Sequence, residues 1–432
     1  MAKRLTTYIL IALVLGLIVG IALNRYLDAS GTGSEQATAA AGYFAIVTTV
    51  FLRLIKMIIA PLVFATLVVG IAHMGDTAAL GRVGAKALGW FVGASLMSLS
   101  LGLLLVNLLK PGVGMGLVVP AAGTASGVDK AAFNLADFVT HIVPASMIDA
   151  MAKNEILQIV VFSVFVGVAI TAVGEKARPL VRAVEALTAV MLQITDYVMR
   201  FAPVAVFAAV AGTLTEQGPS VIRRLAWFMG SFYLGMAILW VLLIGVAFVV
   251  VGGRTRLLIR YVREPLILAF STASSEAAYP RTLEALDRFG VPSRIASFVL
   301  PLGYSFNLDG SMLYMTFASI FIAQAYGIDL TLGQEITMLL VLMVTSKGIA
   351  GVPRASLVVI AATLPLFNIP EAGLLLILAV DHFLDMGRSA TNVIGNAVAA
   401  SVVARWEGGL EPREPAEIEP PHAPAASAGR SG

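Results

Sequence analysis

Near the C-terminus, residues 374–403 read LLLILAVDHFLDMGRSATNVIGNAVAASVV. Polar and charged residues recur in this apolar run at intervals of four, three, four and four residues. At about 100° per residue they fall within a helical stripe roughly 80° wide. A charge at the bilayer centre costs on the order of 2.5–3.5 kcal/mol to insert, so the stripe must face protein, water or a solute. Its members are Asp381, Asp385, Arg388, Asn392 and Asn396.

Two interpretations of this polar stripe are open. Arg388 could pair with Asp385 or Asp381 and simply neutralise a helix buried in a bundle. One arginine cannot neutralise two aspartates, however, and the surplus carboxylate requires a mobile cation. A guanidinium is suited to a carboxylate, and Asp385 one turn away is suited to an ammonium. The favoured interpretation is therefore a site for a small acidic solute.

The composition of the chain points to lipid as its main solvent. Of 432 residues, 58% are hydrophobic and 13% are charged, well above the apolar share of a soluble domain. The net charge of +3 is small and the basic residues are scattered, which argues against nucleic acid as a partner. Cysteine is absent and the four histidines lack zinc-binding spacing, so we expect no cofactor beyond coupling cations.

Six apolar stretches before residue 252 are close to the length that crosses ~30 Å of hydrocarbon. The first follows Lys3 and Arg4 as in a secretory signal, but it lacks a convincing cleavage site, and we predict an uncleaved span. The Gly- and Ala-rich residues 111–154 are predicted to form an irregular elaboration of the fourth span. The six stretches are Tyr8–Leu23, Phe44–Val69, Leu88–Leu109, Ile156–Val173, Val181–Phe207 and Ala226–Val251.

The distribution of basic residues predicts the orientation. Arg254, Arg256, Arg260 and Arg263 follow the sixth span, and the positive-inside rule places them in the cytoplasm together with the N-terminus. An even number of spans then puts the C-terminus in the cytoplasm as well. Residues 407–432 are rich in Pro, Ala and Glu and are predicted to form a disordered tail.

The second half of the chain has a different pattern. Its apolar arms of about 10–14 residues are too short to span a bilayer alone. Polar segments interrupt them, and irregular backbone at membrane depth is tolerated only where protein buries it or a cavity receives it. We therefore predict two re-entrant hairpins and one broken span around a shared midplane site. The hairpins are Leu257–Phe289, broken at Ser271–Pro280, and Leu330–Ile369, broken at Ser346–Arg354; the broken span is Ile295–Tyr326, interrupted at Asn307–Gly310.

These interruptions have chemistry suited to ions. Broken helices direct unpaired N–H groups at an anion, and small residues such as Ser274 and Ser275 let it approach closely. Asn307 and Asp309 offer oxygen atoms in unwound backbone, which makes a reasonable sodium shell. The alternatives are a flexible surface loop for each hairpin tip and an Asp turn outside the membrane.

Five ordered motifs together resemble a known family. They are MIIAPLVFATLVVGI at residues 57–71, STASSEAAYP, NLDG, GIAGVP and DHFLDMGRSATNVIGN. From the first span to Arg405 the chain is similar to the dicarboxylate/amino acid:cation symporters of the glutamate transporter type. The resemblance implies an all-α polytopic fold of eight transmembrane helices plus two re-entrant hairpins, in a homotrimer of the inner membrane whose transport domains move like elevators.

The same resemblance implies a division of the chain and roles for individual residues. Residues 1–255 would hold six spans of the scaffold and part of the transport domain, residues 256–406 the transport core, and residues 407–432 the tail. Arg388 would hold the side-chain carboxylate of the substrate and Asp385 its amino group. The substrate-binding set is Ser274, Ser275, Gly351, Val352, Asp385, Arg388, Ser389 and Asn392; the cation-binding set is Ser95, Ser305, Asn307, Asp309 and Asn396, with Asn307 and Asp309 as sodium ligands.

The chain departs from sodium-coupled aspartate carriers at the implied cation sites. Asn396 stands where those carriers have an aspartate, and Phe91 and Ala94 stand where they have tyrosine and threonine oxygens. Both sites are chemically weakened, so protons are a candidate coupling ion beside sodium. Glu276 resembles the pattern of bacterial dicarboxylate carriers, whereas Asp385 resembles that of amino-acid carriers. An amino acid is favoured because Asp385 would repel the second carboxylate of a dicarboxylate.

The sequence therefore favours a secondary active symporter, not an enzyme, that takes up aspartate or glutamate with sodium or protons. A C4-dicarboxylate symporter is the alternative within this class. Two alternatives belong to other classes: an anion channel lined by Arg388 and the hairpin tips, and an intramembrane hydrolase in which Asp309 and Asp385 share a proton.

Overall fold

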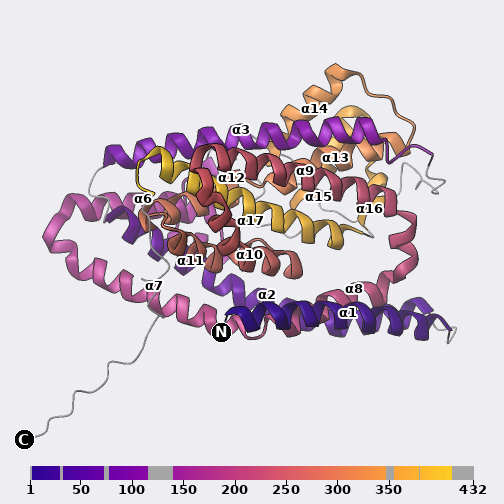
Figure 1. The fold of residues 1–432 in the computed structure, drawn as a ribbon, viewed down its shortest axis with the longest axis horizontal. Coiled ribbons are helices and arrows are strands. Elements are labelled where there is room, and N and C mark those ends of the chain that lie inside the picture. The colour runs from indigo at the N-terminus through magenta and orange to yellow at the C-terminus, as the bar shows by residue number, and fades with distance from the viewer. Residues whose placement is uncertain are drawn as a thin grey trace, which may run out of the picture.

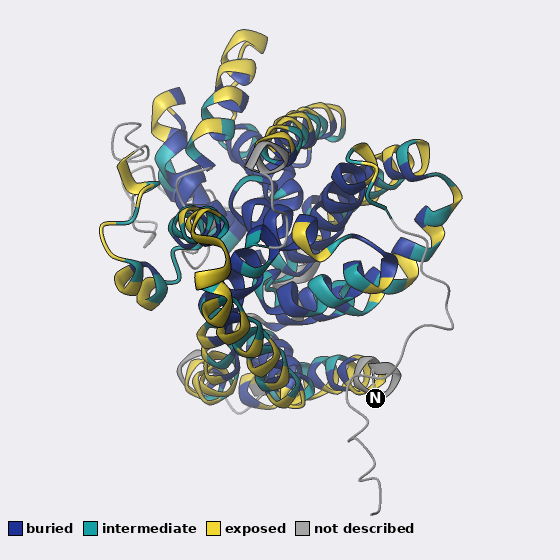
Figure 2. Ribbon diagram, turned by 90° about the vertical axis from the view of Figure 1, so that its left-hand side faces the viewer, coloured by how far each residue is buried: buried dark blue, intermediate teal, exposed yellow. Residues whose placement is uncertain are grey.

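The computed structural model describes residues 2–29, 33–72, 77–114, 140–346, 355–378 and 380–410. Over these ranges the regular secondary structure is helical, and the longer helices run roughly alongside one another (Figure 1). Buried residues gather at the centre of this bundle and exposed residues lie on its outer helices (Figure 2). Many of the exposed side chains are large and apolar, among them Ile18, Val241 and Val249. An apolar outside is what a bilayer solvates, so the pattern fits a multi-pass membrane protein.

Five stretches of the described residues are long and apolar enough to cross a membrane. They include the predicted first, second, third, fourth and sixth spans; the count of eight spans stays a prediction. The stretches are Thr7–Asp28, Gln36–Ala72, Gly81–Leu109, Ile156–Met199 and Ala226–Thr272. The helices of the first half are α1 (Ala2–Ala29), α2 (Gly33–Ala72), α3 (Thr77–Leu109), α5 (Met147–Lys153), α6 (Ile156–Val173), η1 (Gly174–Ala177), α7 (Arg178–Met199), α8 (Ala202–Arg224) and α9 (Ala226–Val251).

The stretch predicted as one span, Val181–Phe207, is divided in the structure. Helix α7 ends at Met199 and α8 begins at Ala202. Pro203 explains the division, because a proline has no N–H to continue the helical ladder and is favoured in the first turn of a new helix. Helix α8 then packs along α1 and α2 (Figure 1).

The second half shows the predicted interruptions where the structure describes them. The first predicted hairpin is interrupted between Thr272 and Tyr279, and the predicted broken span is interrupted at Asn307 and Leu308. Residues 347–354, at the tip of the second predicted hairpin, lie outside the described residues, as do residues 411–432 of the predicted tail. The helices are η2 (Gly252–Arg254), α10 (Thr255–Thr272), η3 (Glu276–Ala278), α11 (Tyr279–Phe289), α12 (Ser293–Phe306), α13 (Asp309–Ala325), α14 (Leu332–Thr345), α15 (Ala355–Thr363), η5 (Leu364–Phe367), η6 (Glu371–Gly373), α16 (Leu374–Leu378) and α17 (Asp381–Trp406).

Helix α17 occupies the interior of the bundle. It packs against α3, α9, α10, α12 and α13, so that neighbours cover it on several sides (Figure 1). From Met386 to Ala404 each of its residues is buried. Four members of the predicted polar stripe, Asp381, Arg388, Asn392 and Asn396, are buried within protein, as the insertion cost of charges in lipid requires, and Asp385 is partly exposed.

Candidate functional site

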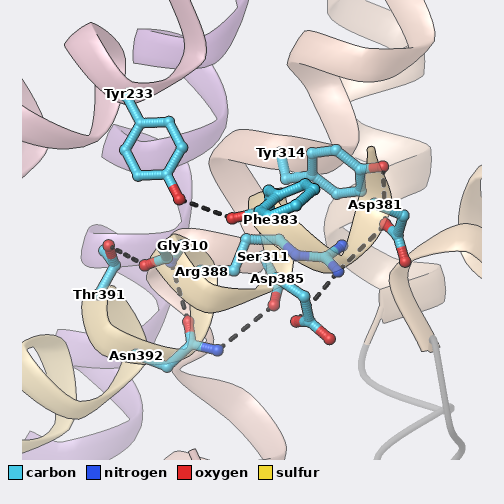
Figure 3. A network of polar contacts seen from close by, with 11 residues as sticks. Tyr233, Gly310, Ser311, Tyr314, Asp381, Phe383, Asp385, Arg388, Thr391 and Asn392 are labelled. Carbon is cyan, nitrogen blue, oxygen red and sulfur yellow. Dashed lines mark hydrogen bonds and ion pairs between the residues drawn. The ribbon is translucent and has the colours of Figure 1, made fainter. Parts of the chain in front are cut away.

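The arginine of the stripe is the centre of the site. The side chain of Arg388 is 2% exposed, and its Nη2 atom lies 3.3 Å from Oδ1 of Asp381 and 3.0 Å from Oδ1 of Asp385. The guanidinium also lies 4.1 Å from the ring centre of Tyr314, whose hydroxyl donates to Asp381 (Figure 3). Arg388 thus pairs with both aspartates, which is the pairing that the neutral-bundle interpretation requires.

The pairing leaves part of the guanidinium unused. Nε and Nη1 of Arg388 are buried, and neither has a hydrogen-bond partner among the described residues. A buried donor without a partner costs about 1–3 kcal/mol, and more when it is charged. Asp385 is 33% exposed at its side chain, whereas Asp381 is 3% exposed. The site therefore offers free cationic donors beside an accessible carboxylate.

Helix α13 meets α17 one turn further along. The backbone N–H of Gly310 donates to Oδ1 of Asn392 at 2.9 Å, and Nδ2 of Asn392 donates to Ser311 at 3.3 Å (Figure 3). A Cβ atom on Gly310 would lie 2.6 Å from the carbonyl oxygen of Arg388, so a larger residue would force the helices apart. Glycine at this position lets the start of α13 approach the site.

Helix α9 packs against both α13 and α17. The hydroxyl of Tyr233 donates to the carbonyl of Phe383 at 2.6 Å (Figure 3). The indole of Trp240 donates to Thr391 at 2.8 Å. These contacts fix the rotation of α17 about its axis. Tyr233, Trp240, Tyr314 and Ser311 were not predicted from the sequence; the available signal was a hydroxyl or indole within an otherwise apolar span.

A second polar cluster surrounds the break between α12 and α13. Nδ2 of Asn307 donates to Asp309 at 3.1 Å and to Oδ1 of Asn396 at 3.2 Å. All three residues are fully buried. Oδ1 of Asn307 and Nδ2 of Asn396 are buried without a hydrogen-bond partner in the described chain. Asp309 begins α13, where the helix dipole favours an acidic side chain.

Helix α3 contributes hydroxyls to this break cluster. Ser98 donates to Asp309 at 3.3 Å, and Ser95 donates to the carbonyl of Phe306 at 3.5 Å. The hydroxyl of Ser305 is buried and finds no partner among the described residues. Ser98 was missed by the sequence analysis, although it lies one helical turn after Ala94. The predicted cation residues are thus mutually linked or adjacent around one break.

The break cluster contains oxygen ligands of the kind that sodium prefers. It combines one carboxylate with amide, hydroxyl and backbone oxygens, which is a shell for a hard monovalent cation. In the part of the chain that the structure describes, there is no group of three or more His, Cys, Asp or Glu that could hold a metal ion. The chemistry therefore suits a weakly held cation better than a structural transition metal.

The hairpin residues predicted to bind substrate are less fully described. Ser275 is buried, and the hydroxyl of Ser274 accepts the backbone N–H of Ala277 at 3.2 Å. Helix α10, which leads to this tip, packs against α17. Ser389 is buried beside Arg388. Gly351 and Val352 lie outside the described residues, so their role stays a prediction.

Comparison with known proteins identifies the family. Residues 5–406 match the model of the sodium:dicarboxylate symporter family. The chain belongs to that family. This symporter is 42% identical over 407 residues to the "Proton/glutamate-aspartate symporter" of Escherichia coli (strain K12), covering 92% of each chain.

Two further relatives of the symporter are similar to it over nearly the whole chain. The "C4-dicarboxylate transport protein" of Laribacter hongkongensis is 40% identical and covers 95% of this chain and 92% of its own. The "Proton/sodium-glutamate symport protein" of Geobacillus stearothermophilus is 39% identical, with 93% and 94% covered. The prediction of a symporter is confirmed, and the hydrolase alternative is wrong, because the family consists of transport proteins.

Proposed function

We propose that this symporter is a secondary active carrier that takes up an acidic amino acid, aspartate or glutamate. The observation that supports the proposal is the buried guanidinium of Arg388, which keeps unpartnered Nε and Nη1 atoms beside the partly exposed carboxylate of Asp385. Arg388 would receive the side-chain carboxylate of the solute, and Asp385 would receive its ammonium. Asn392, Ser389, Ser274 and Ser275 would bind the main-chain carboxylate, with Gly351 and Val352 closing over it.

The choice between amino acid and dicarboxylate depends on Asp385. An ionised Asp385 repels the second carboxylate of a dicarboxylate but attracts an ammonium. Relatives at similar identity are named for both classes of solute, as glutamate-aspartate symporters and as C4-dicarboxylate transport proteins. A C4-dicarboxylate carrier is therefore the second candidate.

We infer that the coupling ion occupies the break cluster. Sodium would be held there by Asn307 and Asp309, with oxygens from Ser95, Ser305 and Asn396 nearby. Asn396 brings no charge to this cluster, so a sodium ion would be held by a single carboxylate. Protons are the alternative, and the names of relatives include both ions.

The wider setting of the carrier is also part of the proposal. We propose that the carrier lies in the inner membrane of a bacterium, with both termini in the cytoplasm. By resemblance to its family it would form a homotrimer, in which the transport domain, with residues 256–406 as its core, moves like an elevator. Eight spans with two re-entrant hairpins complete it. Cross-linking of paired cysteines, introduced on α2 and α11, would report relative movement of these elements during transport.

Reconstituted transport tests the central claim. Proteoliposomes containing the full chain are supplied with labelled aspartate or succinate, under an imposed sodium gradient, an imposed proton gradient or neither. We expect aspartate to accumulate only when a gradient is present, because ATP-binding motifs are absent from the sequence. No gradient-dependent accumulation of either solute would overturn the proposal; accumulation of succinate alone would select the second candidate.

A further inference from the structure

A cavity of about 220 Å³ lies away from Arg388, between α2, the loop from α5 to α6 and the tip of the first hairpin. That volume is well above the ~30 Å³ share of one liquid water and below the roughly 300–1,000 Å³ of sites for drug-sized ligands. A solute of a few heavy atoms therefore fits. Its lining consists of Lys56, Ile59, Ala152, Lys153, Asn154, Ile156 and Glu276.

The cavity brings together charges of opposite sign. Lys56 comes from α2 and Glu276 from the hairpin tip, directly after Ser275. Among the described residues, neither side chain forms an ion pair within 4 Å or a hydrogen bond, so the two face the same space without closing on each other. Both are partly buried. Incompletely solvated charges of this kind favour a ligand that offers the opposite charge to each.

The third polar group is Asn154, which caps α5 with a left-handed backbone conformation. Its Oδ1 atom is buried and has no hydrogen-bond donor among the described residues. A donor supplied from the cavity would satisfy it. Lys153, the remaining charged residue of the lining, already pairs with Asp149 at 2.8 Å.

We propose that this cavity is a second, transient docking site for the zwitterionic head of an amino acid. The carboxylate of the ligand contacts Lys56, while its ammonium contacts Glu276 and Oδ1 of Asn154. Because Glu276 adjoins the serines of the hairpin tip, a solute held here waits next to the residues that the proposed function assigns to substrate. This inference rests on that function and extends it, since a dicarboxylate lacks the ammonium that Glu276 recognises.

Equilibrium binding of labelled aspartate to the purified full-length protein tests the docking site. We expect two classes of binding in the unaltered chain, a tight class and one in the millimolar range. Arg388→Ala should remove the tight class and keep the weak one. Adding Glu276→Gln to Arg388→Ala should weaken the remaining class about tenfold, because one charged hydrogen bond is lost.

Succinate and a control variant make the test specific. Glu276→Gln should not weaken succinate binding, whereas Lys56→Gln should weaken both solutes. Glu175→Gln, which removes an exposed carboxylate paired with Arg178, should change neither. Gel-filtration profiles and melting temperatures identify any variant that fails to fold, and Glu276→Asp then serves in place of Glu276→Gln with a smaller loss expected.

Two results would overturn the inference: a weak class that persists unchanged in Glu276→Gln, or equal weakening of aspartate and succinate by that variant. These are distinct from failure of the proposed function, which would appear as a tight class that survives Arg388→Ala.

Discussion

Helices α9 and α17 have the same length, 26 residues each, and opposite surroundings. Helix α9 carries no charged residue and exposes apolar side chains, with Val241 70% and Val249 83% exposed. Helix α17 carries Asp381, Asp385 and Arg388, and almost all of it is buried. In a soluble protein the charged helix would lie outside. Here the apolar helix faces lipid, and the charged helix is buried where protein groups can pair with its charges.

The two helices nevertheless meet along one seam. Trp240 and Tyr233 of α9 donate to α17, and Met236 lies so close to Gly387 that a Cβ atom there would collide with it. The inner face of α9 is thus matched to α17, while its outer face is free to vary among apolar residues. Four substitutions test this contrast, in order of decreasing predicted consequence.

The change with the largest expected effect is Arg388→Ala. It leaves Asp381 and Asp385 without their cation, and breaking a buried ion pair costs about 3–5 kcal/mol. We expect aspartate uptake to fall at least about a hundredfold and the melting temperature to drop. Proteoliposome uptake and thermal unfolding measure the two effects. Arg405→Ala, on the exposed end of the same helix, is the control; uptake near the unaltered level in Arg388→Ala would refute the site assignment.

A charge on the outer face of α9 should be nearly as harmful. Val241→Asp places a carboxylate toward lipid, at an insertion cost of about 2.5–3.5 kcal/mol. We expect a large loss of folded protein in the membrane fraction, measured by fluorescence-detected gel filtration. Val241→Leu should be neutral. Normal yield of Val241→Asp would mean that this face contacts protein or water and not lipid.

A smaller effect is expected from Asn396→Asp in the break cluster. The added carboxylate lies near Asp309 and repels it, unless a cation binds between them. We expect the sodium concentration for half-maximal aspartate uptake to fall about tenfold, equivalent to about 1.4 kcal/mol. Asn392→Asp, one turn closer to Arg388, should instead weaken binding of the solute. Unchanged sodium dependence in Asn396→Asp would show that the missing charge does not determine the coupling ion.

The smallest expected effect is that of Trp240→Phe at the seam. The variant keeps the aromatic packing but loses the hydrogen bond to Thr391, whose hydroxyl retains its bond to the carbonyl of Gly387. We expect a loss of about 0.5–1.5 kcal/mol in the free energy of unfolding and little change in transport. Trp227→Phe is the control, because the exposed indole of Trp227 on the same helix donates only a long hydrogen bond of 3.4 Å to the carbonyl of Leu109. A strong transport defect in Trp240→Phe would mean that α9 does more than support α17.

Much of the fold was accessible from the sequence because the bilayer imposes simple rules. Ile156–Val173 and Ala226–Val251 begin and end in the structure at the predicted residues, since a polar or glycine residue ends each apolar run. The break at Asn307 was predicted because the polar segment Asn307–Gly310 interrupts an apolar stretch. Protein must bury such a segment at membrane depth. The division before Pro203 was not, because the hydropathy stays high across it.

The candidate site was predicted in part, and its limits have a physical origin. Asp385, Arg388 and Asn392 lie on one helix, so their sequence spacing alone predicts that they share a face. The partners from other helices, such as Tyr314 and Ser98, depend on tertiary packing, which periodicity does not encode. Asp381 appeared in the stripe, but only the structure shows that it shares Nη2 of Arg388 with Asp385.

One short piece of backbone connects the two polar clusters. Gly310 follows Asp309 directly and donates to Asn392, which lies on α17 between Arg388 and Asn396. Gly395 lies so close to the carboxylate of Asp309 that a Cβ atom there would force this side chain to move. A cation that moved the start of α13 would therefore act on Asn392, and through it on the groups around Arg388. If the solute raises the affinity of the protein for the cation by some factor, thermodynamic linkage requires the cation to raise the affinity for the solute by the same factor.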